Sequence, residues 1–347
     1  MNKEMKELFE LFAILSEPVY TLAEYFAIVN NRINNQVSNE YEESIDPIME
    51  FKESFRKMVY FYDENKLAFL RFAAELSDKK GIWEPDVNSA PFELFIDFDF
   101  IYLFKKDENY YLVFPDELKE LFREITSDKN FAGINTKLLE QKFYATALLE
   151  LYGIYDIYQF IEVWNHHHKD KITYKEAETF FIDRSCYEPD YYFEKNYIVH
   201  NRLNKTKFNE LLEIIQNKKY YMPTKSVLMD CYSKIYEYRL PGDNEIDAFI
   251  AEYIENEYKL EKLQFEIKFS CEHLKKPAEL SAILIESDMP VENTVFMEKF
   301  ERLYNNLRNN THVWTLRGFT LYQYRNETNK SIPEFHLPRN KYIRNGI

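Results

Sequence analysis

Glycine, cysteine and long apolar runs are all scarce in this chain. Six glycines among 347 residues leave little room for Gly-rich nucleotide loops, while 28 tyrosines and 29 phenylalanines favour packed helices over β-sandwiches. The three cysteines (Cys186, Cys231 and Cys271) are scattered, which argues against a disulfide framework or a zinc ribbon. No apolar run approaches the ~18 residues of a membrane span, and the amino terminus is unlike a signal peptide. We therefore expect a mainly helical, cytoplasmic protein without membrane association.

Common catalytic signatures are also missing from the sequence. It contains no GxSxG nucleophile elbow, no GxGxxG dinucleotide motif and no phosphate loop ending in GK[ST]. We accordingly predict no cofactor. A catalytic function is the less favoured expectation.

Charge is distributed unevenly along the chain. The net charge is −15, yet the segment from Arg302 to the end carries eight basic and two acidic residues, a charge of +6. The preceding 301 residues then carry −21, which discourages general binding to nucleic acid phosphates. The basic end is either an interaction segment or a tail that folds back onto the acidic surface.

A possible duplication is the most informative pattern. The stretch VYTLAEYFAIVNNR (19–32) aligns with IYDIYQFIEVWNHH (154–167) at an offset of 135, and both are predicted to be amphipathic helices. Downstream, residues 98–125 and 190–215 each read as a strand, a turn, a second strand and a helix. We predict two winged-helix-like modules with short β-hairpins, the first carrying an insertion of extra helix around residues 49–76.

The remainder of the chain reads as a helical bundle. One long helix is predicted over residues 242–273, followed by shorter helices near 278–286 and 292–309. The fold class is thus mainly α, with a minor α+β component. The predicted domains are module 1 (1–130), module 2 (131–220), the bundle (221–328) and an extended basic tail (329–347).

The run WNHHHKD suggests a metal site at first sight. Adjacent helical residues point ~100° apart, so three consecutive histidines cannot converge on one ion, and only His166 with Asp170 has the i, i+4 spacing of a helical ligand pair. The favoured interpretation is a helix end, where basic groups interact with the last carbonyls.

The run FIDFDF contains the only enzyme-like arrangement. Asp97 and Asp99 would share one face of a strand, where paired carboxylates hold Mg²⁺ for phosphoryl or nucleotidyl transfer. A solvated strand face is the favoured alternative.

The run NNLRNNTHVWTLRGFT (305–320) places asparagine and arginine beside a tryptophan, as in surfaces that stack and hydrogen-bond to a nucleic acid or peptide. The alternative is that the asparagines end a helix and Trp314 packs on the bundle. The candidate binding residues of this region and the tail are Arg308, Asn309, Asn310, Trp314, Arg317, Arg325, Lys341 and Arg344.

Three runs carry a family resemblance: EKNYIVHNRL (194–203), KKYYMPTKSVLMDCYSKIYEYR (218–239) and NNLRNNTHVWTLRGFTLYQYRNE (305–327). Together they resemble uncharacterised Gram-positive bacterial proteins that carry a SEC-C zinc motif at their carboxyl end. The resemblance covers roughly residues 154–344 and implies no particular activity. This chain has no cysteine after Cys271, so no zinc ligand carries over.

We expect a non-catalytic interaction or regulatory protein that binds a protein partner, with nucleic acid contact through its basic carboxyl-terminal segment. One alternative is an inhibitor or defence-related factor from a mobile element whose acidic surface mimics nucleic acid. A second alternative is a metal-dependent transferase that uses Asp97 and Asp99.

Overall fold

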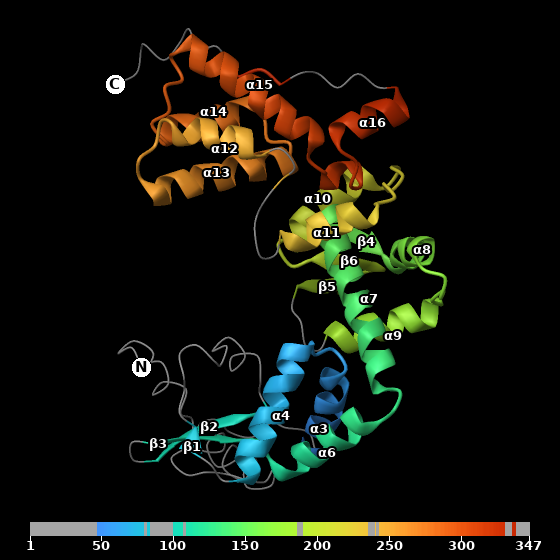
Figure 1. The fold of residues 1–347 in the computed structure, drawn as a ribbon. Coiled ribbons are helices and arrows are strands. Elements are labelled where there is room, and N and C mark those ends of the chain that lie inside the picture. The colour runs from blue at the N-terminus through green and yellow to red at the C-terminus, as the bar shows by residue number, and fades with distance from the viewer. Residues whose placement is uncertain are drawn as a thin grey trace, which may run out of the picture. The chain divides into compact units, whose positions relative to one another are not determined.

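The protein forms two compact units. The computed structural model describes residues 47–79, 82–83, 100–106, 109–185, 190–234, 240, 243–329 and 335–337. Unit 1 spans Met1–Glu140 and unit 2 spans Gln141–Ile347, so the predicted second module and the predicted bundle share a unit. The described part is mainly helical with two small antiparallel sheets, which confirms the coarse fold prediction (Figure 1). Among the described residues, no helix has the length and apolar character needed to cross a membrane.

Unit 1 combines helices with one sheet. Its elements are α3 (Pro47–Val59), α4 (Glu64–Asp78), β1 (Ile82–Trp83), β2 (Tyr102–Lys106), β3 (Asn109–Val113) and α6 (Asp116–Ser127). Asp63 separates α3 from α4 because its carboxylate caps α4, accepting a hydrogen bond from the backbone N–H of Lys66 at 2.9 Å. The insertion predicted as extra helix around residues 49–76 is therefore two helices.

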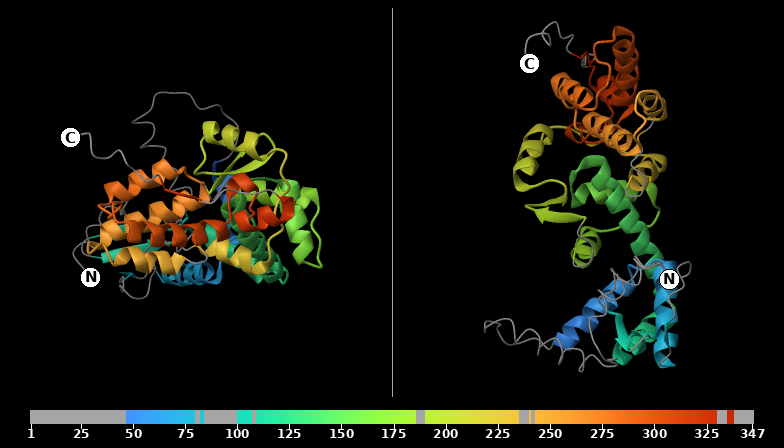
Figure 2. Two further views of the ribbon diagram at one scale, coloured as in Figure 1. Left: turned by 90° about the horizontal axis from the view of Figure 1, so that it is seen from above. Right: turned by 90° about the vertical axis from the view of Figure 1, so that its left-hand side faces the viewer.

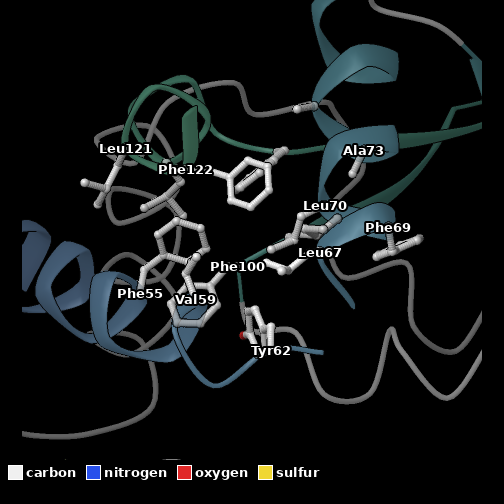
Figure 3. Close-up of a cluster of buried hydrophobic side chains, with 14 of the residues drawn as sticks. Phe55, Val59, Tyr62, Leu67, Phe69, Leu70, Ala73, Phe100, Leu121 and Phe122 are labelled. Atoms are coloured by element: carbon white, nitrogen blue, oxygen red, sulfur yellow. The ribbon is translucent and has the colours of Figure 1, made fainter. Parts of the chain in front are cut away.

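The core of unit 1 is aromatic. Phe55 of α3 lies 4.9 Å from the ring of Phe100 and 5.7 Å from that of Phe114, and Leu70 of α4 is fully buried in the same cluster (Figure 3). Ser77 ties α4 to the strand end, since its hydroxyl donates to the Phe114 carbonyl at 3.1 Å and accepts from its N–H at 3.3 Å. The buried Ser77 hydroxyl and the backbone polar groups of Phe114 thus satisfy one another.

The first part of unit 2 is a sheet module. It consists of α7 (Phe131–Tyr152, whose first residues belong to unit 1), β4 (Ile154–Asp156), α8 (Ile157–His167), α9 (Tyr174–Ser185), β5 (Tyr191–Glu194), β6 (Tyr197–His200) and α10 (Lys205–Ile215). Gly153, at φ 67°, ends α7, and Asp156 caps α8 by accepting from the N–H of Gln159 at 3.0 Å. The helix predicted over 154–167 is wrong for its first three residues, which pair as a strand with β6.

The two sheets have the same strand order and matching ladders. The orders are β1-β3-β2 and β4-β6-β5. Each of the four residue pairs in the β5–β6 ladder lies 88 positions after a residue pair in the β2–β3 ladder. The first strand of each sheet also pairs with an equivalent position, since Ile154 pairs with Val199 and Ile82 pairs with Tyr111. The two hairpin predictions are confirmed. The first copy of the 135-residue offset, residues 19–32, lies outside the described part.

The helices that follow form a bundle. They are α11 (Lys225–Ser233), α12 (Asp243–Ala251), α13 (Glu257–Glu272), α14 (Pro277–Glu286), α15 (Thr294–Asn310), the short 3-10 helix η1 (Trp314–Leu316) and α16 (Leu321–Thr328), and α12 to α15 pack together (Figure 2). The long helix predicted over 242–273 is wrong. Asn256 starts a new helix there, because its side chain caps α13 by accepting from the N–H of Lys259 at 3.0 Å. The two shorter helices are confirmed.

A buried ion cluster fixes α12 against α13. The Lys268 ammonium, which is almost fully buried, lies 2.9 Å from a carboxylate oxygen of Asp243 and 2.8 Å from one of Asp247. Burial opposes the charged form, but the two carboxylates outweigh it and raise the pKa of Lys268.

The segment after α15 joins the bundle to the sheet module. Trp314 donates its indole N–H to the carbonyl of Glu150 at 2.8 Å. A Cβ on Gly153 would lie 2.4 Å from an indole carbon of Trp314, and one on Gly318 (φ 81°) would lie 2.6 Å from the ring of Tyr152. Both glycines are required by close approach as well as by their backbone conformation.

Candidate functional site

An exposed hollow in the sheet module is the strongest candidate site. It has a volume of about 380 Å³ and lies between the start of α8, one face of α9 and the tip of the β5–β6 hairpin. Its lining residues define what we name the α8–α9 groove: Asp156, Ile157, Tyr158, Tyr174, Glu178, Ile182, Phe193, Lys195 and Asn196. Tyr174, Glu178 and Ile182 follow each other at four-residue spacing, so they share one face of α9.

Large apolar side chains are exposed in this groove. Tyr158 is 70% exposed, Ile182 54%, Tyr174 42% and Phe193 41%. The rings of Tyr158 and Tyr174 lie 5.3 Å apart and form one continuous aromatic surface. Single exposed apolar residues are ordinary, but four around one hollow make it the candidate for a binding surface.

The floor of the groove is rigid. On the opposite face of α9, Arg184 is 1% exposed and its guanidinium donates to the hydroxyl of Thr146 at 2.6 Å and to the carboxylate of Asp190. Phe181, next to Ile182 on α9, is fully buried and accepts a hydrogen bond at its carbonyl from the Tyr191 hydroxyl at 2.6 Å. The exposed side chains are therefore presented by a helix whose position is fixed.

The charge of the groove is predominantly negative. Its lining holds two carboxylates, those of Glu178 and Asp156, against one ammonium, that of Lys195 at the hairpin tip. Asp156 already serves the fold, capping α8 and accepting from the Tyr220 hydroxyl at 3.3 Å. The arrangement suits a ligand that combines an apolar group with positive charge.

A second hollow, of about 410 Å³, lies between α11, the end of α15 and the start of α16. Its lining includes Cys231 of α11 and Lys234, which follows the last residue of that helix, together with His312 and Thr320. The Lys234 ammonium is buried and lies 2.6 Å from the carboxylate of Glu272.

The titratable groups of the second hollow are held in fixed protonation states. Burial raises the pKa of the Cys231 thiol to about 12, and burial lowers the pKa of His312 to about 4. Burial also opposes the charge on Lys234, but Glu272 outweighs it and raises the pKa of that group. At neutral pH the thiol is protonated, the imidazole is neutral and the ammonium is paired, so none of the three is an activated nucleophile.

The histidine run lies at the carboxyl end of α8, as the helix-end interpretation predicted. The exposed His166 belongs to the last turn, His167 contacts the Pro223 carbonyl through Nε2 at 2.9 Å, and the His168 ring stacks on Trp164 at 3.9 Å. Asp170 is exposed beyond the helix end. Within the described ranges, no group of three or more His, Cys, Asp or Glu side chains is placed to hold a metal ion.

Two of the predicted binding residues lie in the core. Trp314 is 8% exposed and packs with residues of the sheet module such as Ile154 and Phe208. Arg317 is 5% exposed, donates from Nε to the Ile215 carbonyl at 3.2 Å, and lies 4.0 Å over the ring of Tyr220. Trp314 therefore packs, as the structural alternative expected, but in the core of the sheet module and not in that of the bundle.

The other predicted binding residues are dispersed. Asn309 and Asn310 end α15, and the Asn310 amide donates to the Asn306 carbonyl at 2.9 Å. Arg308 lies on α15, with its guanidinium centre 5.6 Å over the ring of Phe335, and Arg325 lies on α16. The remaining candidates, Asp97, Asp99, Lys341 and Arg344, lie outside the described residues.

Sequence reasoning missed the α8–α9 groove, although a signal was present. Phe180, Phe181 and Ile182 are consecutive on α9, and consecutive helical residues cannot all face one core. The first two are buried and Ile182 is exposed. The hairpin contribution, Phe193, could not be located without knowing which face of the sheet α9 covers.

This chain matches no protein-family model, no curated protein and no solved structure. The resemblance to proteins with a SEC-C motif therefore stays a prediction.

Proposed function

We propose that this protein is a non-catalytic interaction protein that binds a protein partner through the α8–α9 groove. The observation that carries the proposal is the set of four large apolar side chains, each at least 41% exposed, around one hollow of about 380 Å³. Surfaces of this kind hold an anchoring side chain of a partner in a desolvated pocket.

The proposed architecture is a winged-helix-like module, with unit 1 as a diverged copy. The order α7-β4-α8-α9-β5-β6 with sheet order β4-β6-β5 supports the first statement, and the 88-residue spacing of the hairpin ladders supports the second. In such a module α9 would be the recognition helix and the β5–β6 hairpin the wing.

The charge of α9 favours a protein over duplex DNA as the partner. Glu176, Glu178 and Asp183 outnumber Lys175, and Arg184 is buried in its ion pair with Asp190. An acidic recognition surface repels phosphates. We propose that the groove takes a peptide segment with a large apolar side chain beside a lysine or arginine, since Glu178 lies next to the apolar surface.

A peptide-display selection tests this proposal. The purified full chain is immobilised and a random 12-residue library is selected on it, with counter-selection on the Ile182→Glu variant. Ile285→Glu is the matched control, because Ile285 is an exposed isoleucine (43%) on α14, outside the groove. Binding of synthetic copies of enriched peptides is then measured by fluorescence anisotropy.

The expected peptides combine a large apolar residue with an adjacent basic one. We expect them to bind Ile182→Glu at least tenfold more weakly than the unmodified chain, about 1.4 kcal/mol, and Ile285→Glu within about twofold. No enrichment, or equal affinity for both variants, would refute the groove as the docking surface.

A further inference from the structure

We propose that the second hollow, between α11, α15 and α16, binds the uncharged base of a nucleoside through the Lys234 ammonium and the His312 imidazole. Its volume of about 410 Å³ is typical of small-molecule pockets, which span roughly 300–1,000 Å³. Polar side chains from α11, from the end of α15 and from the segment that leads into α16 line it. It shares no lining residue with the α8–α9 groove, so its ligand is independent of the partner proposed there.

The Lys234 ammonium has hydrogen-bond donors to spare for a ligand. The side chain is only 5% exposed, and Glu272 accepts one hydrogen bond from it at 2.6 Å. An ammonium carries three N–H groups, and among the described residues the Glu272 carboxylate is its only hydrogen-bond partner. Because a buried donor without an acceptor is unfavourable, a ligand acceptor in the hollow is stabilised by this group.

His312 presents a hydrogen-bond acceptor in a fixed position. Its Nδ1 lies 2.6 Å from the carbonyl oxygen of Gly318, and since a carbonyl only accepts, Nδ1 carries the proton. Burial lowers the pKa of His312 to about 4, so the ring is neutral at physiological pH and Nε2 is an unprotonated acceptor. Within the described ranges, no protein donor is hydrogen-bonded to Nε2. The Tyr221 ring, 5.2 Å away, and a backbone bridge to Thr320 hold the imidazole in place.

The charge of the hollow favours an uncharged ligand over an anion. Lys234 is the only cationic side chain in the lining, and its charge is already paired with Glu272. The lining also includes the exposed carboxylate of Asp230. A phosphate or carboxylate group would therefore meet a carboxylate without an unpaired cation to compensate, whereas a neutral molecule would not be repelled.

A nucleobase satisfies these requirements. Each base carries a hydrogen-bond donor beside an acceptor on its Watson–Crick edge, which match Nε2 of His312 and the Lys234 ammonium, and its ring is uncharged. Tyr322, which is 60% exposed, lines the same hollow and supplies an aromatic ring for stacking. A sugar has neutral hydroxyl groups too, but it lacks the flat ring that stacks on an aromatic side chain.

Binding is measured in the full chain by isothermal titration calorimetry with adenosine, guanosine, cytidine and uridine, and with their 5′-monophosphates. Val227→Phe fills the hollow from α11, and Val295→Phe is its matched control, because Val295 is 74% exposed on α15 outside the hollow. Lys234→Met removes the donors. Tyr322→Ala removes the ring, and its matched control is Tyr258→Ala, at a tyrosine that is 77% exposed on α13.

We expect at least one nucleoside to bind with a Kd below about 1 mM, and its 5′-monophosphate to bind more weakly because of the Asp230 carboxylate. Val227→Phe and Lys234→Met should each weaken nucleoside binding about tenfold or more, and Tyr322→Ala about fivefold. The two control variants should bind within about twofold of the unmodified chain.

Three results would overturn the proposal. The first is that no nucleoside binds at about 1 mM, and the second is that binding is unchanged in Val227→Phe or in Tyr322→Ala. The third is that the monophosphate binds as tightly as the nucleoside or more tightly, which would indicate an anion site. If circular dichroism shows that Lys234→Met does not fold, Val227→Phe and Tyr322→Ala decide the question. Peptide binding at the α8–α9 groove should be unchanged in every variant, which separates this test from that of the proposed function.

Discussion

Replacing Trp314 with alanine should strongly destabilise unit 2, because Trp314 is a core residue. Removing a surface binding residue would change stability little. The indole ring fills the space between the bundle and the sheet module, 8% exposed, and packs on Ile154, Phe208 and Ile215. Its N–H satisfies the carbonyl of Glu150 at 2.8 Å. Alanine removes both the packing and the hydrogen bond.

The expected loss is large compared with the stability of a typical domain. Truncating a buried tryptophan to alanine costs about 3–5 kcal/mol, and a buried acceptor left without its partner accounts for about 1–3 kcal/mol of such losses. A protein of ordinary stability has only about 5–15 kcal/mol. Trp314→Phe keeps most of the ring but not the N–H, so it should lose a smaller amount, about 1–3 kcal/mol.

Urea unfolding followed by far-ultraviolet circular dichroism measures the difference. With a slope of about 2 kcal/mol per molar urea, Trp314→Ala should shift the midpoint of the unit 2 transition by about 2 M. The control is Tyr258→Ala, which removes a ring that is 77% exposed on α13 and should change stability by less than about 0.5 kcal/mol. A Trp314→Ala chain within 1 kcal/mol of the unmodified protein would refute the packing account.

Three further predictions use the same unfolding assay. Gly153→Ala should cost at least about 2 kcal/mol, since Gly153 has φ 67° and a Cβ would lie 2.4 Å from the Trp314 ring; a cost that Trp314→Ala does not partly relieve would contradict this. Burial lowers the pKa of His312 to about 4, below its ordinary value of 6.5, so only the unfolded chain gains this proton between those values. Stability should therefore fall as pH drops from 6.5 towards 4, and His312→Gln should flatten that part of the profile, whereas an unchanged profile would count against it. Lys268→Met should cost about 3–5 kcal/mol because it removes the cation that pairs with the buried carboxylate of Asp243 and with that of Asp247; a loss below 1 kcal/mol would be inconsistent with that ion cluster.

The sequence predicted those elements whose signals are local. The hairpins followed from alternating aromatic residues around polar turns, and the helix predicted after the second hairpin begins at Lys205, directly after its cap Asn204. The end of α8 at the histidine run is likewise set by neighbouring residues.

The misassigned elements depend on distant partners or on a competing cap. Residues 154–156 have a helical apolar spacing, but β6, more than 40 positions later, pairs with them as a strand. One long helix was predicted over 242–273 because the apolar periodicity continues through residues 252–256. Asn256 instead caps a second helix there. The burial of Trp314 depends on Gly153, which lies 161 positions earlier in the chain. No local pattern contains that information.

Gly153 packs against Trp314, and Gly318 packs against Tyr152. The core of the sheet module can therefore be completed only after the segment that contains Trp314 and Gly318 has been synthesised. Synthesis runs from the amino end at about 5–20 residues per second, so the sheet module, which ends at Ile215, leaves the ribosome roughly 5–20 s before the indole that closes its core. During that interval Ile154, Phe208 and Ile215 lack a cover that they have in the finished protein. Nascent chains of this protein should therefore be ready substrates for chaperones until residue 318 has emerged, and a message cut short before that point should yield an aggregation-prone product.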